Sequence, residues 1–263
     1  MTHALHAEWT KLRTLASTTW LLLAAVALTV VVSAAASAAF QCQAGACTAA
    51  QTGADPAKIS LTGVDLGQAI VAVLAVLAIA NEYSTGMISL TLAAMPRRLT
   101  MLAAKATVVT GWVLAAGAVA AGGSVLAGRL ILPGHGLTAV NGYQLLSLGN
   151  GPDLRAAAGS VLYLALIGLL ALGVATAVRD PGVAIGAVLG LLYLFPIISA
   201  VVPDPHLVRH LQQISPMTAG LYIQATTGLR SLPLTPWQGL GVLAAWAAGA
   251  LLLGAVLLRL RDA

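Results

Sequence analysis

Residues 81–105 have the sequence NEYSTGMISLTLAAMPRRLTMLAAK and join two apolar runs that are each long enough to cross a lipid bilayer. The segment carries four charged residues, Glu82, Arg97, Arg98 and Lys105. The hydroxyl of Thr85 can cap a helix, and Pro96 cannot continue one. The pattern therefore predicts a short helix over residues 87–95, held between two membrane spans.

The composition of the whole chain indicates a membrane protein. Of the 263 residues, 59% are hydrophobic and only 8% are charged, whereas soluble domains carry roughly 25% charged residues. The apolar residues gather in runs, which predicts an all-α protein with a single transmembrane domain over residues 1–263. The six predicted spans are residues 20–40, 64–80, 106–132, 154–178, 182–202 and 237–258.

The segments outside the spans have their own patterns. Residues 1–19 predict an amphipathic helix at the membrane surface, with Trp9 on its apolar stripe; the alternative is a plain lead into the first span. A cleaved signal peptide would have a shorter apolar core than residues 20–40. Residues 203–236 contain two short helical pieces, neither of them long enough to span.

The distribution of Lys and Arg predicts the orientation. Eight of them fall on the face that holds both termini and five on the other, which makes the first face cytoplasmic. The net charge of +5 is thereby explained without a nucleic-acid partner, since no basic run interleaves with aromatic residues.

The predicted outer loops contain two candidate sites. Cys42 and Cys47 either form a disulfide that closes a small loop or remain two thiols. His206 and His210 share the spacing of a metal pair, but Leu207 stands where a zinc protease has its glutamate. We expect no metal there and interpret the segment as a solvated helix.

The chain lacks the residues of an enzyme or of an ion-driven pump. No ionisable residue lies in the middle of the six apolar runs, and no phosphate-binding loop or catalytic motif occurs in the sequence. We therefore expect no catalytic, cofactor-binding or metal-binding residues. If the protein transports, its energy enters from outside the membrane, and an ATPase, if one is used, is a second chain.

Three glycines repeat every four residues in the fifth predicted span, Gly182, Gly186 and Gly190. Such a repeat strips one face of a helix of side chains and lets another helix approach closely. The neighbour is either another helix of the same bundle or a second subunit.

Several of these stretches together resemble a known family. Residues 8–13 (EWTKLR), residues 81–88 (NEYSTGMI), the Pro96-Arg97-Arg98 triplet and Lys105 resemble the membrane subunit of an actinobacterial-style ABC (ATP-binding-cassette) exporter, the type-two permease family. The resemblance covers the whole chain, and its most specific part is the EYSTGMI string. Asn81 departs from the small residue expected there.

The resemblance implies roles for the residues of the opening stretch. Residues 87–95 become the coupling helix that docks on the ATPase, through Met87, Ile88 and Leu90, and Glu82 with Tyr83 becomes the hinge that leads into it. Arg97, Arg98 and Lys105 become candidates for contacts with the ATPase or with lipid phosphates, beside the simpler interpretation of membrane anchoring. From the residues alone, Glu82 is a solvated span end, or it forms an ion pair, either within the chain or with an arginine of the ATPase.

The family also implies a re-entrant hairpin at residues 214–226, and an assembly of two ATPases with two permeases, identical or sister chains. The expected function is export of an amphipathic or hydrophobic compound, such as a drug, antibiotic or lipid, across a bacterial cell membrane. The alternative is a membrane scaffold or immunity protein that docks a cytoplasmic partner without transport.

Overall fold

The computed structural model describes residues 9–10, 16–41, 48–84 and 98–261. These residues form helices and loops, and no strand occurs among them. Six helices are long and apolar enough to cross a membrane, which confirms the predicted all-α class and makes the chain a multi-pass helical membrane protein. They are α2 (Ala16–Ala39), α5 (Val64–Ser84), α7 (Arg98–Ile131), α8 (Gly151–Val178), α9 (Pro181–Val201) and α12 (Pro236–Arg261).

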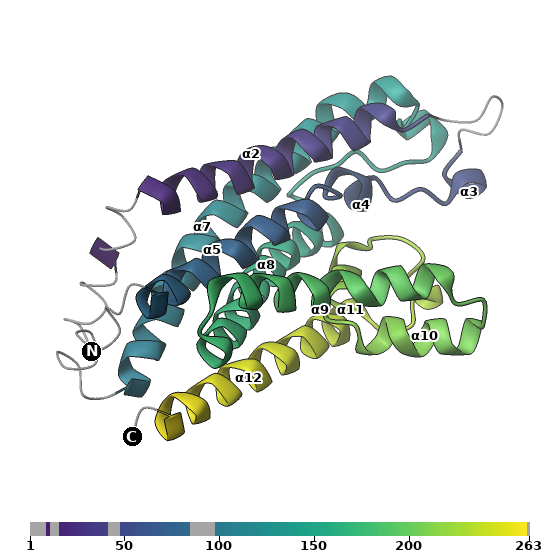
Figure 1. The fold of residues 1–263 in the computed structure, drawn as a ribbon. Coiled ribbons are helices and arrows are strands. Elements are labelled where there is room, and N and C mark those ends of the chain that lie inside the picture. The colour runs from purple at the N-terminus through teal and green to yellow at the C-terminus, as the bar shows by residue number, and fades with distance from the viewer. Residues whose placement is uncertain (1–8, 11–15, 42–47, 85–97, 262–263) are drawn as a thin grey trace.

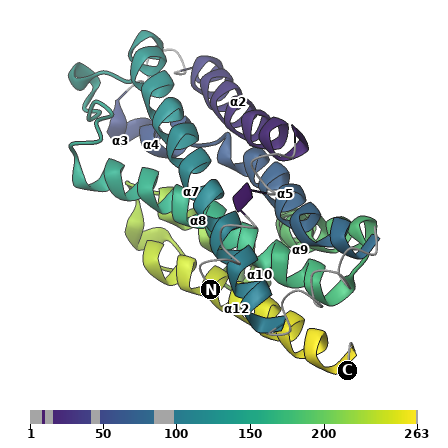
Figure 2. The same ribbon diagram turned by 90° about the vertical axis from the view of Figure 1, so that its left-hand side faces the viewer.

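Helix α8 is the centre of the bundle. It packs against α5, α7, α9 and α12, while α2 stands at the edge against α5 and α7 (Figures 1 and 2). The crossing with α12 is close because Gly173 has no side chain: a Cβ there would lie 2.5 Å from the backbone carbon of Ala250. Small residues at such crossings let the backbones approach, as in other membrane bundles.

Both ends of the described chain lie at the same end of the helix bundle. Figure 1 shows that α2 begins there and α12 ends there, and that α5 ends and α7 begins at the same end. The turn between α8 and α9 lies there too. We call this the termini end and the opposite one the far end.

The helices at the termini end are longer than the predicted spans. Helix α5 continues to Ser84 and α7 already begins at Arg98, so the connection between them shortens from residues 81–105 to residues 85–97. The charged residues Glu82 and Lys105 were expected outside the spans and instead lie within helices. Their mutual neutralisation, described below, explains how both helices continue past a charged position.

Short helices cover the far end. They are α3 (Ala49–Thr52), α4 (Pro56–Ser60), and the 3₁₀ turns η1 (Leu132–His135) and η2 (Ala139–Asn141). Asp55 caps α4 by accepting hydrogen bonds from the amides of Ala57 (3.1 Å) and Lys58 (3.2 Å). It also accepts bonds from the Thr226 amide (2.5 Å), the Thr226 hydroxyl (2.7 Å) and the Thr227 amide (3.0 Å). One carboxylate thereby ties the α4 loop to the segment that leads into α12.

Between α9 and α12 the chain folds back beside the spans. Helix α10 (Pro205–Ile214) packs on α9, and α11 (Pro216–Leu221) with η3 (Tyr222–Gln224) packs against α8 and α12, before η4 (Leu229–Ser231) (Figure 1). The indole of Trp246 donates to the Ile214 carbonyl at 2.9 Å. Trp246 lies ten residues after the start of α12, about 15 Å along that helix. The hairpin therefore reaches about two-fifths of the way along α12. Its position in the sequence agrees with the predicted residues 214–226.

Candidate functional site at the termini end

A buried ion pair joins the two helices that flank residues 85–97. The Nζ of Lys105 on α7 lies 2.9 Å from Oε1 of Glu82 on α5, and the two side chains are 2% and 7% exposed. The same ammonium donates to the carbonyl oxygen of Ala78 at 3.0 Å. Because Ala78 and Glu82 are one helical turn apart, they present two acceptors to one cation.

Burial makes this pair sensitive to the loss of either partner. An ion withdrawn from water is stable only when an opposite charge and hydrogen bonds replace the water. Removal of one partner from such a pair costs about 3–5 kcal/mol. The structure therefore shows Glu82 in an ion pair within the chain and not as a solvated span end. Lys105 was a candidate for phosphate contacts, but its ammonium is turned inward to α5.

A second contact joins α5 to the turn between α8 and α9. The guanidinium carbon of Arg179 lies 5.3 Å from the ring centroid of Tyr83. A cation over an aromatic face at this distance contributes about 0.5–2 kcal/mol, with the larger values where water is excluded. Tyr83 follows Glu82 directly, so adjacent residues at the end of α5 contact two different elements.

The α8–α9 turn itself is short and well capped. Arg179 ends α8 with a left-handed φ of 68°, and its amide donates to the Ala175 carbonyl at 2.9 Å. Asp180 accepts a hydrogen bond from the Val183 amide at 2.7 Å and Pro181 is the first residue of α9. Asp180 thus caps the N-terminus of α9.

The N-terminal segment contacts α7 through two tryptophans. The rings of Trp9 and Trp112 are stacked, with centroids 4.7 Å apart and an interplanar angle of 17°. Aromatic pairs of this kind contribute about 0.5–1.5 kcal/mol beyond the area that they bury. The stacked pair places residue 9 beside the same helix that carries Lys105.

The structure describes only some of the residues predicted to couple to a partner. Glu82 and Tyr83 lie at the end of α5, as described above. Arg98 is the first residue of α7, and its side chain lies outside the described part. Four further coupling candidates and the two cysteines also lie outside the described residues, namely Met87, Ile88, Leu90, Arg97, Cys42 and Cys47.

The three predicted glycines lie on a face of α9 that no other part of the described chain covers. Gly182, Gly186 and Gly190 are all exposed. A Cβ at Gly186 or Gly190 would meet no heavy atom within 4 Å, and one at Gly182 would meet only the Asp180 side chain at 3.4 Å. The described helices of the same chain therefore do not use this face for close packing.

Sequence reasoning missed a polar network inside the bundle. Gln68 on α5 is fully buried, accepts a hydrogen bond from the Tyr163 hydroxyl of α8, and donates to the Asp65 carbonyl at 3.0 Å. The hydroxyl of Tyr193 on α9 donates to the same carbonyl at 2.7 Å. Polar residues in otherwise apolar runs were the available signal. The network fastens α5 to α8 and α9.

No group of three or more His, Cys, Asp and Glu side chains able to hold a metal occurs among the described residues. Comparison with models of known protein families and with curated proteins found no match to this chain.

Proposed function

We propose that this chain is the membrane subunit of an ABC-type exporter in a bacterial cell membrane, driven by a separate ATPase that binds the termini end. The proposal rests on the resemblance of residues 8–13, 81–88 and 96–98 to that permease family and on the six-helix bundle. It places both termini in the cytoplasm, which agrees with the excess of Lys and Arg predicted for that face.

The observation that carries the proposal is the Glu82–Lys105 pair. It joins α5 and α7 close to the two points where residues 85–97 leave and re-enter the bundle. A force applied to that segment by a partner therefore acts on both helices together and does not separate them. The Tyr83–Arg179 contact extends the same connection to α8 and α9.

The outward glycine face of α9 suits the second permease of the assembly, either an identical or a sister chain. Close helix contact in membranes relies on small residues because lipid supplies no hydrophobic drive for association. The substrate is an amphipathic or hydrophobic compound, and membrane lipid surrounds the remaining apolar faces of the bundle.

The test is reconstitution with a co-expressed ATPase that contains a phosphate-binding loop. In lipid vesicles, we expect ATP-dependent movement of amphipathic dyes and no ATPase activity from this chain alone. Leu90→Asp, in the proposed docking segment, should abolish binding of the ATPase and transport. Val140→Asp is the matched control because Val140 is 96% exposed on η2 at the far end.

The outcomes separate the two candidate functions. Transport that continues without any ATPase would overturn the exporter proposal. Binding of a cytoplasmic partner that needs Leu90, with no transport under any condition, would instead support the scaffold or immunity function.

A further inference from the structure

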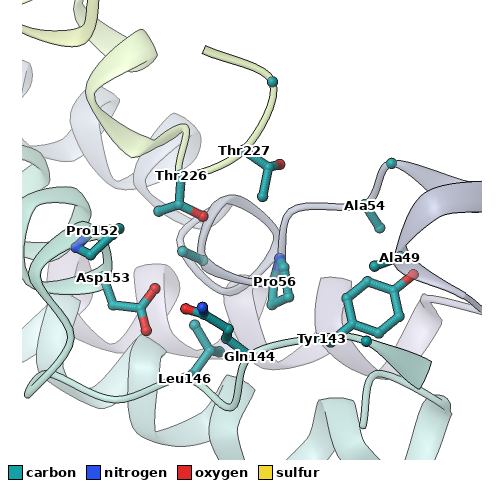
Figure 3. Close-up of a pocket in the computed structure, with 14 residues that line it drawn as sticks. Ala49, Ala54, Pro56, Tyr143, Gln144, Leu146, Pro152, Asp153, Thr226 and Thr227 are labelled. Atoms are coloured by element: carbon teal, nitrogen blue, oxygen red, sulfur yellow. The ribbon is translucent and has the colours of Figure 1, made fainter. Parts of the chain in front are cut away.

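A cavity of about 460 Å³ lies at the far end of the bundle, away from the site described above. Its walls come from three separate connections, residues 49–57, 142–153 and 226–228 (Figure 3). The bonds from Thr226 and Thr227 to Asp55 hold the first and third of these together. Cavities of this size, largely apolar and with a few converging polar groups, are typical of small-molecule sites.

One wall of the cavity carries a negative charge. Asp153 is the charged residue among the described residues that line it. Its Oδ2 accepts hydrogen bonds from the Ser147 amide (3.0 Å) and from the Asn150 side-chain amide (3.4 Å), both of which are neutral donors.

Asp153 forms no ion pair with a cation among the described residues. All the donors to Asp55, behind the wall, are also neutral amides or hydroxyls. The guanidinium of Arg155 donates to the Ala225 carbonyl at 2.5 Å, and no ion pair joins it to either carboxylate within the described residues. Hydrogen bonds from neutral groups stabilise a carboxylate without removing its negative charge, so the wall that carries Asp153 favours a cation.

The wall opposite Asp153 is aromatic. Figure 3 shows Tyr143 and Asp153 on opposite sides of the pocket, with Pro56 and Gln144 between them. The Tyr143 hydroxyl is hydrogen-bonded to the Thr52 hydroxyl, which holds the ring in place. An aromatic face attracts organic cations, and quaternary ammonium groups are recognised in this way in proteins.

We propose that this cavity binds a small organic cation, a quaternary ammonium or protonated amine, through the Asp153 carboxylate and the Tyr143 ring. The volume equals that of roughly 15 water molecules at about 30 Å³ each, far more than a metal ion fills. Pro56 and Leu146 supply apolar contacts for the alkyl groups of the ligand. The site is independent of the exporter proposal, because binding here requires neither an ATPase nor transport.

The probes are choline and its uncharged isostere 3,3-dimethylbutan-1-ol, which have nearly the same shape and differ in charge. Calorimetric titration of the purified full-length protein in detergent is expected to give saturable choline binding. The alcohol should bind at least about tenfold more weakly. Equal binding of the two probes, or no choline binding at millimolar concentration, would overturn the proposal.

Two variants of lining residues test where choline binds, and a third serves as the control. Asp153→Asn should weaken choline binding by about tenfold or more, while the asparagine oxygen still accepts the bond from Ser147 and the unfolding temperature stays unchanged. Tyr143→Leu should weaken it by about threefold.

The matched control is Asp204→Asn, a helix cap at the same end that accepts from the His206 amide at 2.8 Å and does not line the cavity. It should bind choline as the unmodified protein does. Unchanged binding in Asp153→Asn would show that the cation binds elsewhere and would overturn the assignment.

Discussion

Lys105 fastens α7 to two successive turns of α5, because its ammonium lies 2.9 Å from the Glu82 carboxylate and 3.0 Å from the Ala78 carbonyl. Glu82 and Lys105 are 23 positions apart in the chain, and residues 85–97 lie between them. The contact thus joins the two helices from which the connection of residues 85–97 emerges.

The ion pair should show strong coupling in a double-mutant cycle. Lys105→Met removes the ammonium that faces the buried Glu82 carboxylate, and Glu82→Gln removes the negative charge that faces the buried Lys105 ammonium, so each should lower the free energy of unfolding by about 3 kcal/mol. The double variant should lose less than the sum of the two. Thermal unfolding of the four proteins in the same detergent measures this.

Additive losses in that cycle would mean that the two charges do not interact in the folded protein. A useful second readout is ATP-dependent transport, if the exporter proposal holds. A variant that stays folded and no longer transports would place the pair in the coupling path, whereas loss of folding alone would make it structural.

Two glycines of neighbouring spans should respond in opposite ways to leucine. A side chain at Gly186 meets nothing within 4 Å, so Gly186→Leu should leave the monomer as stable as before and weaken association with a second permease. A side chain at Gly173 would overlap the α12 backbone at 2.5 Å, so Gly173→Leu should lower stability by about 3 kcal/mol, the upper range for overpacking.

Unfolding temperature and native mass spectrometry of both variants separate these effects. Assembly that is unchanged in Gly186→Leu would count against a subunit contact on this face of α9. Full stability in Gly173→Leu would contradict the close crossing of α8 and α12.

Asp55 should hold the connecting segments at the far end of the bundle together. Asp55→Ala removes the acceptor for the amides of half-buried Thr226 and exposed Thr227 as well as the cap of α4, where the buried Ala57 amide left without an acceptor costs about 1–3 kcal/mol. We expect faster hydrogen exchange at Thr226 and Thr227, measured by mass spectrometry. Asp204→Ala serves as the comparison, since Asp204 caps α10 alone and should affect exchange only in that helix.

The sequence predicted the spans well because long apolar runs have few other structures available to them. It predicted the helix ends at the termini end less well. Glu82 and Lys105 each look like loop residues when considered singly, and only their pairing across α5 and α7 allows both helices to continue.

The internal contacts of the bundle were beyond prediction for a related reason. Gln68 and Tyr163 are 95 residues apart, and no local pattern indicates which buried polar groups will meet. The glycine repeat of α9 predicted close packing but not its partner. The stacking of Trp9 on Trp112 joins residues far apart in the sequence, so no local pattern could predict it.

The two-residue turn at Arg179 and Asp180 sets the direction in which α9 leaves α8. A left-handed residue followed by a helix cap leaves little backbone freedom between α8 and α9. Helix α9 has 21 residues, so its far end lies about 31 Å from the turn. Over that length, a difference of about 5° in the direction set at the turn corresponds to about 3 Å at the far end, by the same geometry. Tyr83 contacts Arg179 at this turn, so its ring lies where the direction of the α9 glycine face is set.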